Sequence, residues 1–280
     1  MAGACSDQGT LGLIAGGGRF PFLIAEGARR SGLRVVAVGF RSNTDPGLPA
    51  CVDEYQELRL GQLGKLIDFF KSRGVDRVLM GGTINKARAM DIIPDFRGAR
   101  LLLKLGGKGD DALLRAISDE LASEGMPVRR AHELIPGLLM PEGFLTGRRP
   151  SPGVMADIRF GWSVAKELGR LDIGQTVVVR RQVVAAVEAL EGTDNAIRRG
   201  CSLAGQGAVV VKVFKPGQDE RLDLPSVGLT TIETMREAGA VCLAVEAGRS
   251  LFFDRERALN EASRAGISVI GITDGLLDGD

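Results

Sequence analysis

The sequence predicts an α/β protein made of two α/β units, the first built on a parallel sheet covered by helices. Two observations predict this class. Short apolar runs alternate with segments of helical spacing through the first half of the chain. A stretch rich in proline and glycine then separates this half from a second one, in which the alternation starts afresh. Because parallel strands need long crossover connections, such alternation is typical of βαβ units.

The first half opens with the apolar run LGLIA at 11–15, which ends in three glycines and is followed by the helix-like segment FPFLIAEGARR at 20–30. The segment 63–73 carries apolar residues at helical spacing, and Gly74 after it is typical of a helix C-cap. The clearest helix, at 110–124, has acids at its start, where the helix dipole favours them. Further strands are expected at 34–40, 52–60 and 75–80.

The middle of the chain, IPGLLMPEGFLTGRRPSPG, contains too many prolines and glycines for a regular element. We therefore expect an N-terminal domain at 1–135, a linker at 136–153 and a C-terminal α/β catalytic domain at 154–280. Two such domains usually bind a ligand in the cleft between them, so we expect the site there. In the C-terminal domain, strands are expected at 176–184, 208–214, 241–245 and 267–272, and helices at 154–171, 193–203, 230–238 and 255–265.

Composition excludes several classes of protein. Lys and Arg number 36 against 35 Asp and Glu, a net charge of +1, which lacks the basic excess of a dedicated nucleic-acid binder. The four cysteines are scattered singly, so a structural zinc site is not expected. We see no secretion signal and no apolar run long enough to span a bilayer, and therefore expect a cytoplasmic protein. The single histidine, His132, excludes any mechanism that needs two histidines within one chain.

A glycine loop comes directly after the first strand and consists of Gly16, Gly17, Gly18 and Arg19. Glycines there let the backbone approach a phosphate, and the helix that follows offers unpaired N–H groups. The ribose-binding acid of a dinucleotide site is missing, since the second strand ends in Arg41. Two interpretations stay open, a nucleotide or phosphate contact and a simple tight turn.

A second loop, with Gly82 and Thr83, follows the strand at 75–80. The carboxyl ends of parallel strands share one edge of a sheet, so we expect the two glycine loops to lie together there. The alternative is again a turn without a ligand.

The clearest helix begins at Asp110 and Asp111. Adjacent acids at a helix start are explained by capping alone. They could also hold a cation or a sugar hydroxyl, and we carry Asp110 as a candidate substrate-binding residue.

A passage of twelve residues gathers cations and carboxylates around a Pro-Gly turn: Lys212, Lys215, Gln218, Asp219, Arg221 and Asp223. Cations for phosphate oxygens and carboxylates for a divalent metal are the parts that phosphoryl transfer needs. Hard oxygen ligands without histidine favour Mg²⁺ or Mn²⁺ over zinc. The alternative is a solvated charged loop.

Several segments together resemble the UDP-2,3-diacylglucosamine pyrophosphatases of the LpxI type: IAGGGRFP, GGTINKAR, GDDALLR, VVVRRQVVAAVEALEGTDNAIRR and VKVFKPGQDERLDLPSVGLTTIE. The resemblance runs from about residue 11 to 272. It implies a Mg²⁺-dependent enzyme of lipid A biosynthesis that cleaves the pyrophosphate bond of UDP-2,3-diacylglucosamine into UMP and 2,3-diacylglucosamine 1-phosphate (lipid X). It also implies a Rossmann-like N-terminal domain and a distinct C-terminal α/β domain, with the lipid product between them.

The resemblance implies roles for particular residues. Asp223 is the expected essential carboxylate, and Asp219 is expected to support the metal or the attacking water, so both are candidate metal ligands. The remaining candidates for substrate binding in the second half are Thr193, Asp194, Lys212, Lys215 and Gln218. The departures from the family pattern, Leu222 and Ser226, remove no charged group.

Two rivals from other classes stay open. An NADP-linked oxidoreductase would use the first glycine loop with Arg41 facing a 2′-phosphate, but it leaves the charged passage unexplained. A non-catalytic binder of nucleotides or lipid sugars would show no turnover. Because the implied substrate is an amphiphile, transient peripheral contact with the inner membrane fits it. A homodimer is left open, and no nucleic-acid partner is expected.

Overall fold

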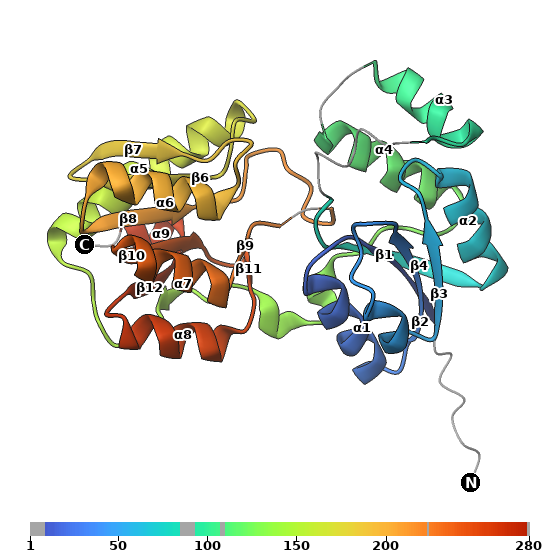
Figure 1. Cartoon of the computed structure of the whole chain (residues 1–280), viewed down its shortest axis with the longest axis horizontal. Coiled ribbons are helices and arrows are strands. Elements are labelled where there is room, and N and C mark those ends of the chain that lie inside the picture. The colour runs from blue at the N-terminus through green and yellow to red at the C-terminus, as the bar shows by residue number, and fades with distance from the viewer. Residues whose placement is uncertain (1–8, 85–92, 107–109, 223, 279–280) are drawn as a thin grey trace, which may run out of the picture. The chain divides into compact units, whose positions relative to one another are not determined.

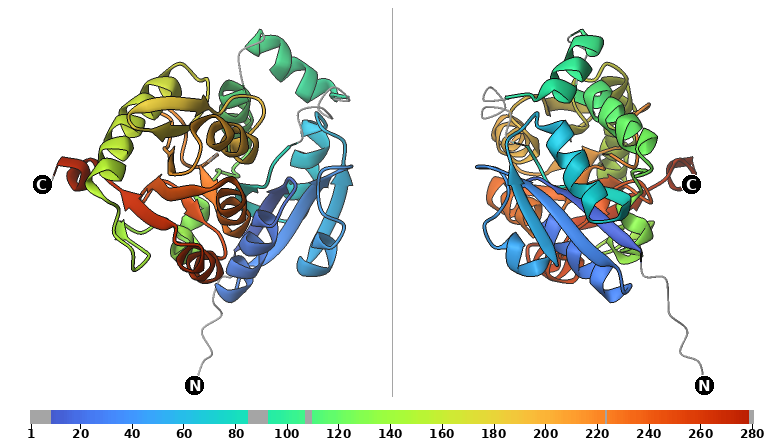
Figure 2. Two further views of the ribbon diagram at one scale, coloured as in Figure 1. Left: turned by 60° about the vertical axis from the view of Figure 1, so that its left-hand side comes forward. Right: turned by 90° about the vertical axis from the view of Figure 1, so that its right-hand side faces the viewer.

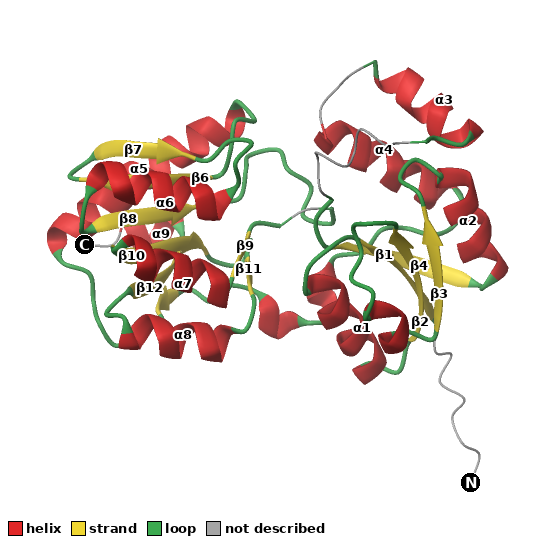
Figure 3. Cartoon of the chain, in the orientation of Figure 1, coloured by secondary structure: helices red, strands yellow, loops and turns green. Residues whose placement is uncertain are grey.

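A computed structural model describes residues 9–84, 93–106, 110–222 and 224–278 (Figure 1). The chain forms two compact units, and Figure 2 gives two further views of them. Unit 1 comprises Met1–Pro136 together with Asp219–Asp223, and unit 2 comprises Gly137–Gln218 and Leu224–Asp280. Both units combine helices and strands, as the α/β prediction requires (Figure 3).

Unit 1 is built on a four-stranded sheet in the order β3-β2-β1-β4. Every strand pair in it is parallel, which confirms the predicted parallel sheet. Its strands are β1 (Thr10–Ala15), β2 (Arg34–Phe40), β3 (Glu54–Leu58) and β4 (Val75–Gly81). Its helices are α1 (Phe20–Arg30), α2 (Leu63–Ser72), α3 (Phe96–Leu105) and α4 (Asp110–Ser123), with short 3-10 helices at Leu48–Cys51 and Ala131–Glu133; a further one, Pro136–Leu138, lies where the chain passes from unit 1 into unit 2.

Helices cover both faces of the unit 1 sheet. Ile24 and Ala28 of α1 pack with Leu13 of β1 on one face, whereas Phe70 of α2 and Leu121 of α4 belong to the core of the other. A strand buried on both faces needs apolar side chains at consecutive positions. This is why the strands were visible in the sequence as short continuous apolar runs.

Helix α3 was not among the predicted helices. Its N-cap residue Asp95 accepts a hydrogen bond from the Gly98 backbone N–H at 2.9 Å, and Gly106 ends it in a left-handed conformation. Arg97 fixes α3 to α4 through ion pairs with Glu120, at 2.6 Å, and with Glu124. Hydrogen bonds from Lys71 and then Arg97 lower the pKa of Glu124 to about 2, so this anchor persists down to strongly acidic pH.

Unit 2 contains a six-stranded mixed sheet in the order β5-β12-β10-β8-β6-β7. Strands β12, β10 and β8 are parallel, whereas β5, β6 and β7 each run antiparallel to a neighbour. The strands are β5 (Gly143–Phe144), β6 (Thr176–Arg180), β7 (Val183–Val187), β8 (Ala208–Lys212), β10 (Ala240–Glu246) and β12 (Ser268–Ile272), and a separate parallel pair is formed by β9 (Ser226–Val227) and β11 (Leu251–Phe252).

The helices of unit 2 also divide between the two faces of the sheet. Trp162 of α5 packs in one core, and Ile197 of α6 and Ile232 of α7 pack in the other. The helices are α5 (Pro152–Arg170), α6 (Thr193–Ala204), α7 (Leu229–Ala238), α8 (Arg255–Arg264) and α9 (Asp274–Asp278). Across the described ranges, no helix is both long enough and apolar enough to cross a membrane.

The single strand expected at 176–184 is wrong, because β6 and β7 form a hairpin there. The chain turns at Arg181 and Gln182, both with positive φ (49° and 57°). Asp157 of α5, which is 5% exposed, accepts hydrogen bonds from both turn N–H groups, at 3.0 Å and 2.5 Å. This side chain from a distant helix stabilises a turn that lacks the Asn-Gly or Asp-Gly pair of most tight hairpins.

The expectation that 136–153 has no regular element is also wrong. Strand β5 pairs antiparallel with β12, and the Met140 N–H donates to the Ser250 carbonyl at 2.8 Å. Ser151 caps α5, which begins at Pro152. The residues between the prolines and glycines still have backbone N–H and carbonyl groups that can form these hydrogen bonds. Most of the expected linker belongs to unit 2.

We predict that Asp157→Ala lowers the free energy of unfolding by about 2 kcal/mol, because two turn N–H groups lose their acceptor. Urea unfolding followed by circular dichroism measures the change. Ser163→Ala, on the exposed side of the same helix, is the matched control and should leave the midpoint within error. An unchanged midpoint for Asp157→Ala would mean that the turn does not need this carboxylate.

Candidate functional site

The two glycine loops of unit 1 lie together, as predicted. Strands β1 and β4 are neighbours, and their loops pair through Gly17 and Thr83, whose N–H groups each donate to the other's carbonyl at 2.8 Å and 3.0 Å. Gly16 donates to the Gly81 carbonyl at 2.7 Å. The carboxyl edge of this sheet therefore carries a paired double loop.

Most of these glycines are explained by the close approach of the two loops. A Cβ at Gly16 would lie 2.7 Å from the Thr83 carbonyl oxygen, and one at Gly82 would lie 2.5 Å from the Gly17 carbonyl oxygen. Gly18 differs, because its φ is +84° and its surroundings are open. Gly18 and Arg19 are exposed at the start of α1, so a phosphate contact there stays a prediction. The tight-turn interpretation accounts for the other glycines.

Helix α4 begins at Asp110, as expected. The side chain of Asp110 lies outside the part of the chain that the structure describes. Its role in capping or in substrate binding stays a prediction.

Unit 2 contains a buried chain of polar groups made of Lys212, Thr193 and Glu188. The Lys212 Nζ donates to the Thr193 Oγ1 at 2.7 Å, and the Thr193 hydroxyl donates to the Glu188 Oε1 at 2.7 Å. Lys212 is 4% exposed and Glu188 is 9% exposed. The structure thus brings together two predicted site residues and adds Glu188, which sequence reasoning missed.

The sheet explains why these groups meet. Lys212 is the last residue of the otherwise apolar strand β8 and lies opposite Thr176, the first residue of β6. Glu188 directly follows β7, and its N–H donates to the Thr176 carbonyl at 2.9 Å. All three positions therefore belong to one edge of the sheet. The sequence did contain a sign of Glu188, namely an acidic residue directly after an apolar strand. Such a residue is too common to single out a site.

This edge of the sheet holds unsatisfied polar atoms. Within the described ranges, the buried atoms Glu188 Oε2, Thr176 Oγ1 and Gln175 Oε1 have no hydrogen-bond partner. Buried polar groups normally find partners, and exceptions mark strain, water or a functional site. Their presence around Lys212 indicates that polar groups at this edge remain available for water or a ligand.

The start of α6 adds donors beside Lys212. Gly192 precedes the helix and provides no side-chain cap, and the first helical bond runs from the Ala196 N–H to the Gly192 carbonyl at 3.1 Å. The backbone N–H groups before Ala196 therefore lack helical acceptors. An ammonium group and a helix N-terminus together suit a phosphate oxygen. Asp194 lies half-buried in the same first turn, and its proposed contact with substrate stays a prediction.

Lys215 and Gln218 are engaged in the loop that follows β8. The Lys215 ammonium forms an ion pair with Asp172 at 2.7 Å, so its charge is already compensated. Gln218 is 9% exposed, and its N–H donates to the Lys215 carbonyl at 3.1 Å. Roles for both in substrate binding stay predictions.

A largely buried ion pair supports the start of this loop. Lys166 of α5 pairs with Glu246, the last residue of β10, which is 6% exposed. The same carboxylate accepts a hydrogen bond from the Phe214 N–H at 2.7 Å. The backbone just after Lys212 is therefore held by the neighbouring strand, which keeps the lysine in place.

Asp219 is paired with Arg221 within unit 1. Its carboxylate accepts from the Arg221 backbone N–H at 3.0 Å, from Nε at 3.0 Å and from Nη2 at 2.6 Å. The hydrogen bond from the Arg221 side chain is the main cause of a lowered pKa of Asp219. Leu222 packs into the unit 1 core, and Arg130 pairs with Glu220 at 3.6 Å. The charged passage is thus divided, with its last part belonging to the compact unit of the N-terminal region.

The described residues do not by themselves form a metal site. No group of three or more His, Cys, Asp or Glu side chains among them could hold a metal ion. Both oxygens of Asp219 accept hydrogen bonds from Arg221, which they would have to give up to bind a cation. Asp223, the other predicted ligand and the predicted catalytic carboxylate, lies outside the described residues.

Comparisons with known proteins identify relatives along the whole chain. The family model described as the LpxI N-terminal domain matches residues 10–138, and the LpxI C-terminal domain matches residues 141–270. A protein of Caulobacter vibrioides named UDP-2,3-diacylglucosamine pyrophosphatase LpxI is 39% identical over 275 residues, which cover 94% of this chain and 97% of that protein.

Two of the solved structures that match this chain are distant from it in sequence. CobK precorrin-6A reductase aligns at 12% identity and a TM-score of 0.32, over 94% of this chain and 87% of that one. Phosphoribosylglycinamide synthetase from Anaerococcus prevotii aligns at 11% identity and a TM-score of 0.27, over 68% of this chain and 34% of that one. Scores this low carry no argument about function.

We predict that Lys212→Met lowers the free energy of unfolding by about 2 kcal/mol, because the buried Thr193 hydroxyl loses its donor and the carboxylate beyond it loses a nearby cation. The double variant Lys212→Met with Glu188→Gln should be more stable than Lys212→Met alone, since both groups are then neutral. Urea unfolding of the single and double variants measures the coupling. Equal stability of Lys212→Met and the double variant would contradict a link through Thr193.

Proposed function

Because the chain belongs to the LpxI family, we propose that it is a hydrolase that cleaves the pyrophosphate bond of UDP-2,3-diacylglucosamine in lipid A biosynthesis. Cleavage of that bond gives UMP and 2,3-diacylglucosamine 1-phosphate. The observation that carries the proposal is the match of both halves of the chain to the family, together with 39% identity to the named pyrophosphatase. The rival NADP-linked oxidoreductase is not favoured. Its proposed 2′-phosphate ligand, Arg41, pairs with Glu57 at 3.2 Å.

The chemistry requires donors that stabilise negative charge on phosphate oxygens. A pyrophosphate is an anion, and its hydrolysis develops further charge in the transition state. In the proposed mechanism, Lys212 and the N–H groups at the start of α6 hold a phosphate group. Glu188 keeps the ammonium of Lys212 oriented by accepting from Thr193. None of these residues has to transfer a proton.

A carboxylate is needed to orient or deprotonate the attacking water. We assign this role to Asp223 on the resemblance of the DLPSVG segment to the family pattern. Asp219 accepts hydrogen bonds from three nitrogens of Arg221, which suits a residue that positions this guanidinium. Mg²⁺ would supply charge neutralisation at the phosphate oxygens when bound. Its ligands are not assigned beyond the predicted pair.

We predict that Asp223→Asn lowers the rate of UMP release by about a thousandfold, since a neutral amide cannot act as a base. The assay is chromatographic detection of UMP from UDP-2,3-diacylglucosamine in detergent micelles. Asp68→Asn, an exposed acid on α2, is the matched control and should keep the wild-type rate. Wild-type protein that releases no UMP would refute the proposed function. A folded Asp223→Asn variant at full rate would refute only the assignment of this residue.

Metal removal provides a separate test. We expect a chelator to abolish UMP release and added Mg²⁺ to restore it, because the metal offsets charge on the pyrophosphate. The thermal midpoint should also rise when Mg²⁺ is added back, because a metal that binds only the folded state stabilises it. Full activity in excess chelator would contradict Mg²⁺ dependence and leave the hydrolytic reaction standing.

A further inference from the structure

The outer face of α3 is unusually apolar for a helix at the protein surface. Phe96 is 87% exposed and Leu103 is 84% exposed, although they lie two turns apart on the same side of the helix. The opposite side is the one that packs inward, with Gly98 buried and Leu101 against the unit 1 core. A surface helix normally presents polar residues outward, so this face departs from the expected pattern.

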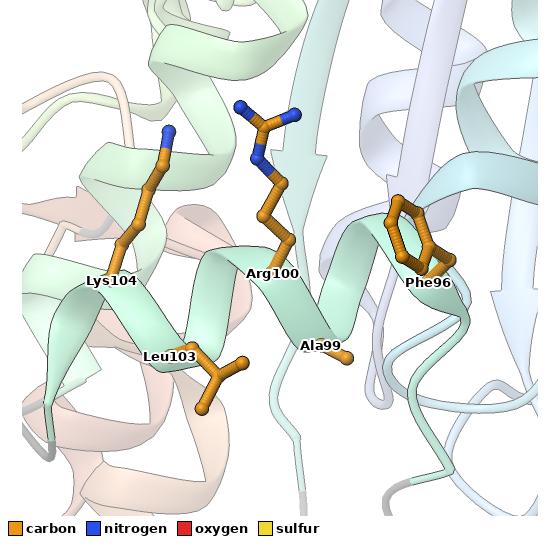
Figure 4. A pocket seen from close by; sticks show the side chains of 5 residues that line it. All are labelled: Phe96, Ala99, Arg100, Leu103 and Lys104. Atoms are coloured by element: carbon orange, nitrogen blue, oxygen red, sulfur yellow. The ribbon is translucent and has the colours of Figure 1, made fainter.

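Two cations flank this apolar stripe. Arg100 and Lys104 are exposed and one turn apart, and Figure 4 shows them extending from the same side of α3. Leu103 and Ala99 extend from the opposite side of the helix in that view, and together with Phe96 these residues line one hollow. The helix contains no acidic residue, and its third cation, Arg97, is already paired with Glu120 and Glu124. Among the described residues, no acidic side chain pairs with Arg100 or Lys104, so the exposed face carries apolar groups beside positive charge.

We propose that this face of α3, formed by Phe96, Ala99, Arg100, Leu103 and Lys104, docks on the surface of a lipid bilayer that contains anionic lipids. Helices that lie in the membrane interface combine Phe or Leu on one side with Lys or Arg beside it, and their cations attract anionic headgroups. The long side chains of Arg100 and Lys104 can reach phosphates while the apolar stripe enters the headgroup region. Charge complementarity thus selects an anionic membrane over a neutral one.

The helix is already formed and fixed before it meets the membrane. Asp95 caps its first turn, and the pairing of Arg97 with α4 holds it on unit 1. Docking therefore orders little of the chain, which lowers its entropic cost. Two large apolar side chains and two cations support only a weak and reversible contact, as expected for a peripheral surface. The inference does not depend on the proposed reaction, because vesicle binding needs no substrate.

The test is flotation of the full-length protein with vesicles of phosphatidylcholine alone or with about one quarter phosphatidylglycerol. We expect binding to the anionic vesicles only, weakened at least about tenfold when salt is raised from about 50 to about 300 mM. Phe96→Ser with Leu103→Ser should lower the partition coefficient about tenfold or more. Arg100→Gln with Lys104→Gln should remove the preference for anionic vesicles.

Matched controls carry the same changes elsewhere on the surface. Leu203→Ser, 70% exposed on α6, and Arg257→Gln with Arg264→Gln, exposed on α8, should bind as the wild type does. Circular dichroism checks that each variant is folded.

Three results would overturn the proposal. The first is wild-type protein that fails to float with anionic vesicles, and the second is α3 variants that bind like the controls. The third is a concentration-dependent dimer in sedimentation velocity that the Phe96/Leu103 variant abolishes, which would assign the face to a second copy of the chain. Loss of vesicle binding with unchanged UMP release in detergent would support the docking surface independently of the catalytic assignment.

Discussion

The burial of a lysine at the end of an apolar strand is the constraint on which the candidate site in unit 2 depends. A charge at this depth needs polar partners, and the Lys212 ammonium donates to the Thr193 hydroxyl, which in turn donates to the Glu188 carboxylate. Strand β8, the first turn of α6 and the end of β7 are therefore held together by one chain of hydrogen bonds. Three consecutive elements of the chain thus present an ammonium group and a helix N-terminus at one edge of the sheet.

The double glycine loop of unit 1 is organised by a different constraint, the contact of backbone with backbone. The loops after β1 and β4 approach so closely that a Cβ at Gly16 or Gly82 would overlap the facing chain. Glycine is required there whether or not a ligand binds. Only Gly18 leaves open space beside a positive φ, which makes it the one position of the loop where glycine points to a ligand more than to packing.

The charged passage that first indicated phosphoryl transfer is divided between two structural roles. Lys212 belongs to the buried network of unit 2, and Lys215 is paired with Asp172. Asp219 and Arg221 pair with each other in unit 1. Composition alone treats these residues as one cluster, whereas the structure separates those that remain available to a ligand from those that hold the chain in place. The apolar and basic outer face of α3 neither belongs to the candidate site nor holds the chain in place. We therefore assign it to a contact with a membrane surface.

Local periodicity and the geometry of parallel strands were enough to predict the α/β class, the parallel order of the first half and the shared edge of the two glycine loops. The family resemblance came from short motifs that need no structure. Tertiary structure decided what depends on distant partners. Asp157 stabilises the turn of a hairpin where a single strand was expected. Strand β5 forms within the expected linker because it pairs with β12. Thr193 links Glu188 to Lys212 by hydrogen bonds. Each of these three contacts joins residues from separate elements of the chain. The residues involved are of common types at common positions, so the sequence alone does not show which of them will meet in the folded protein.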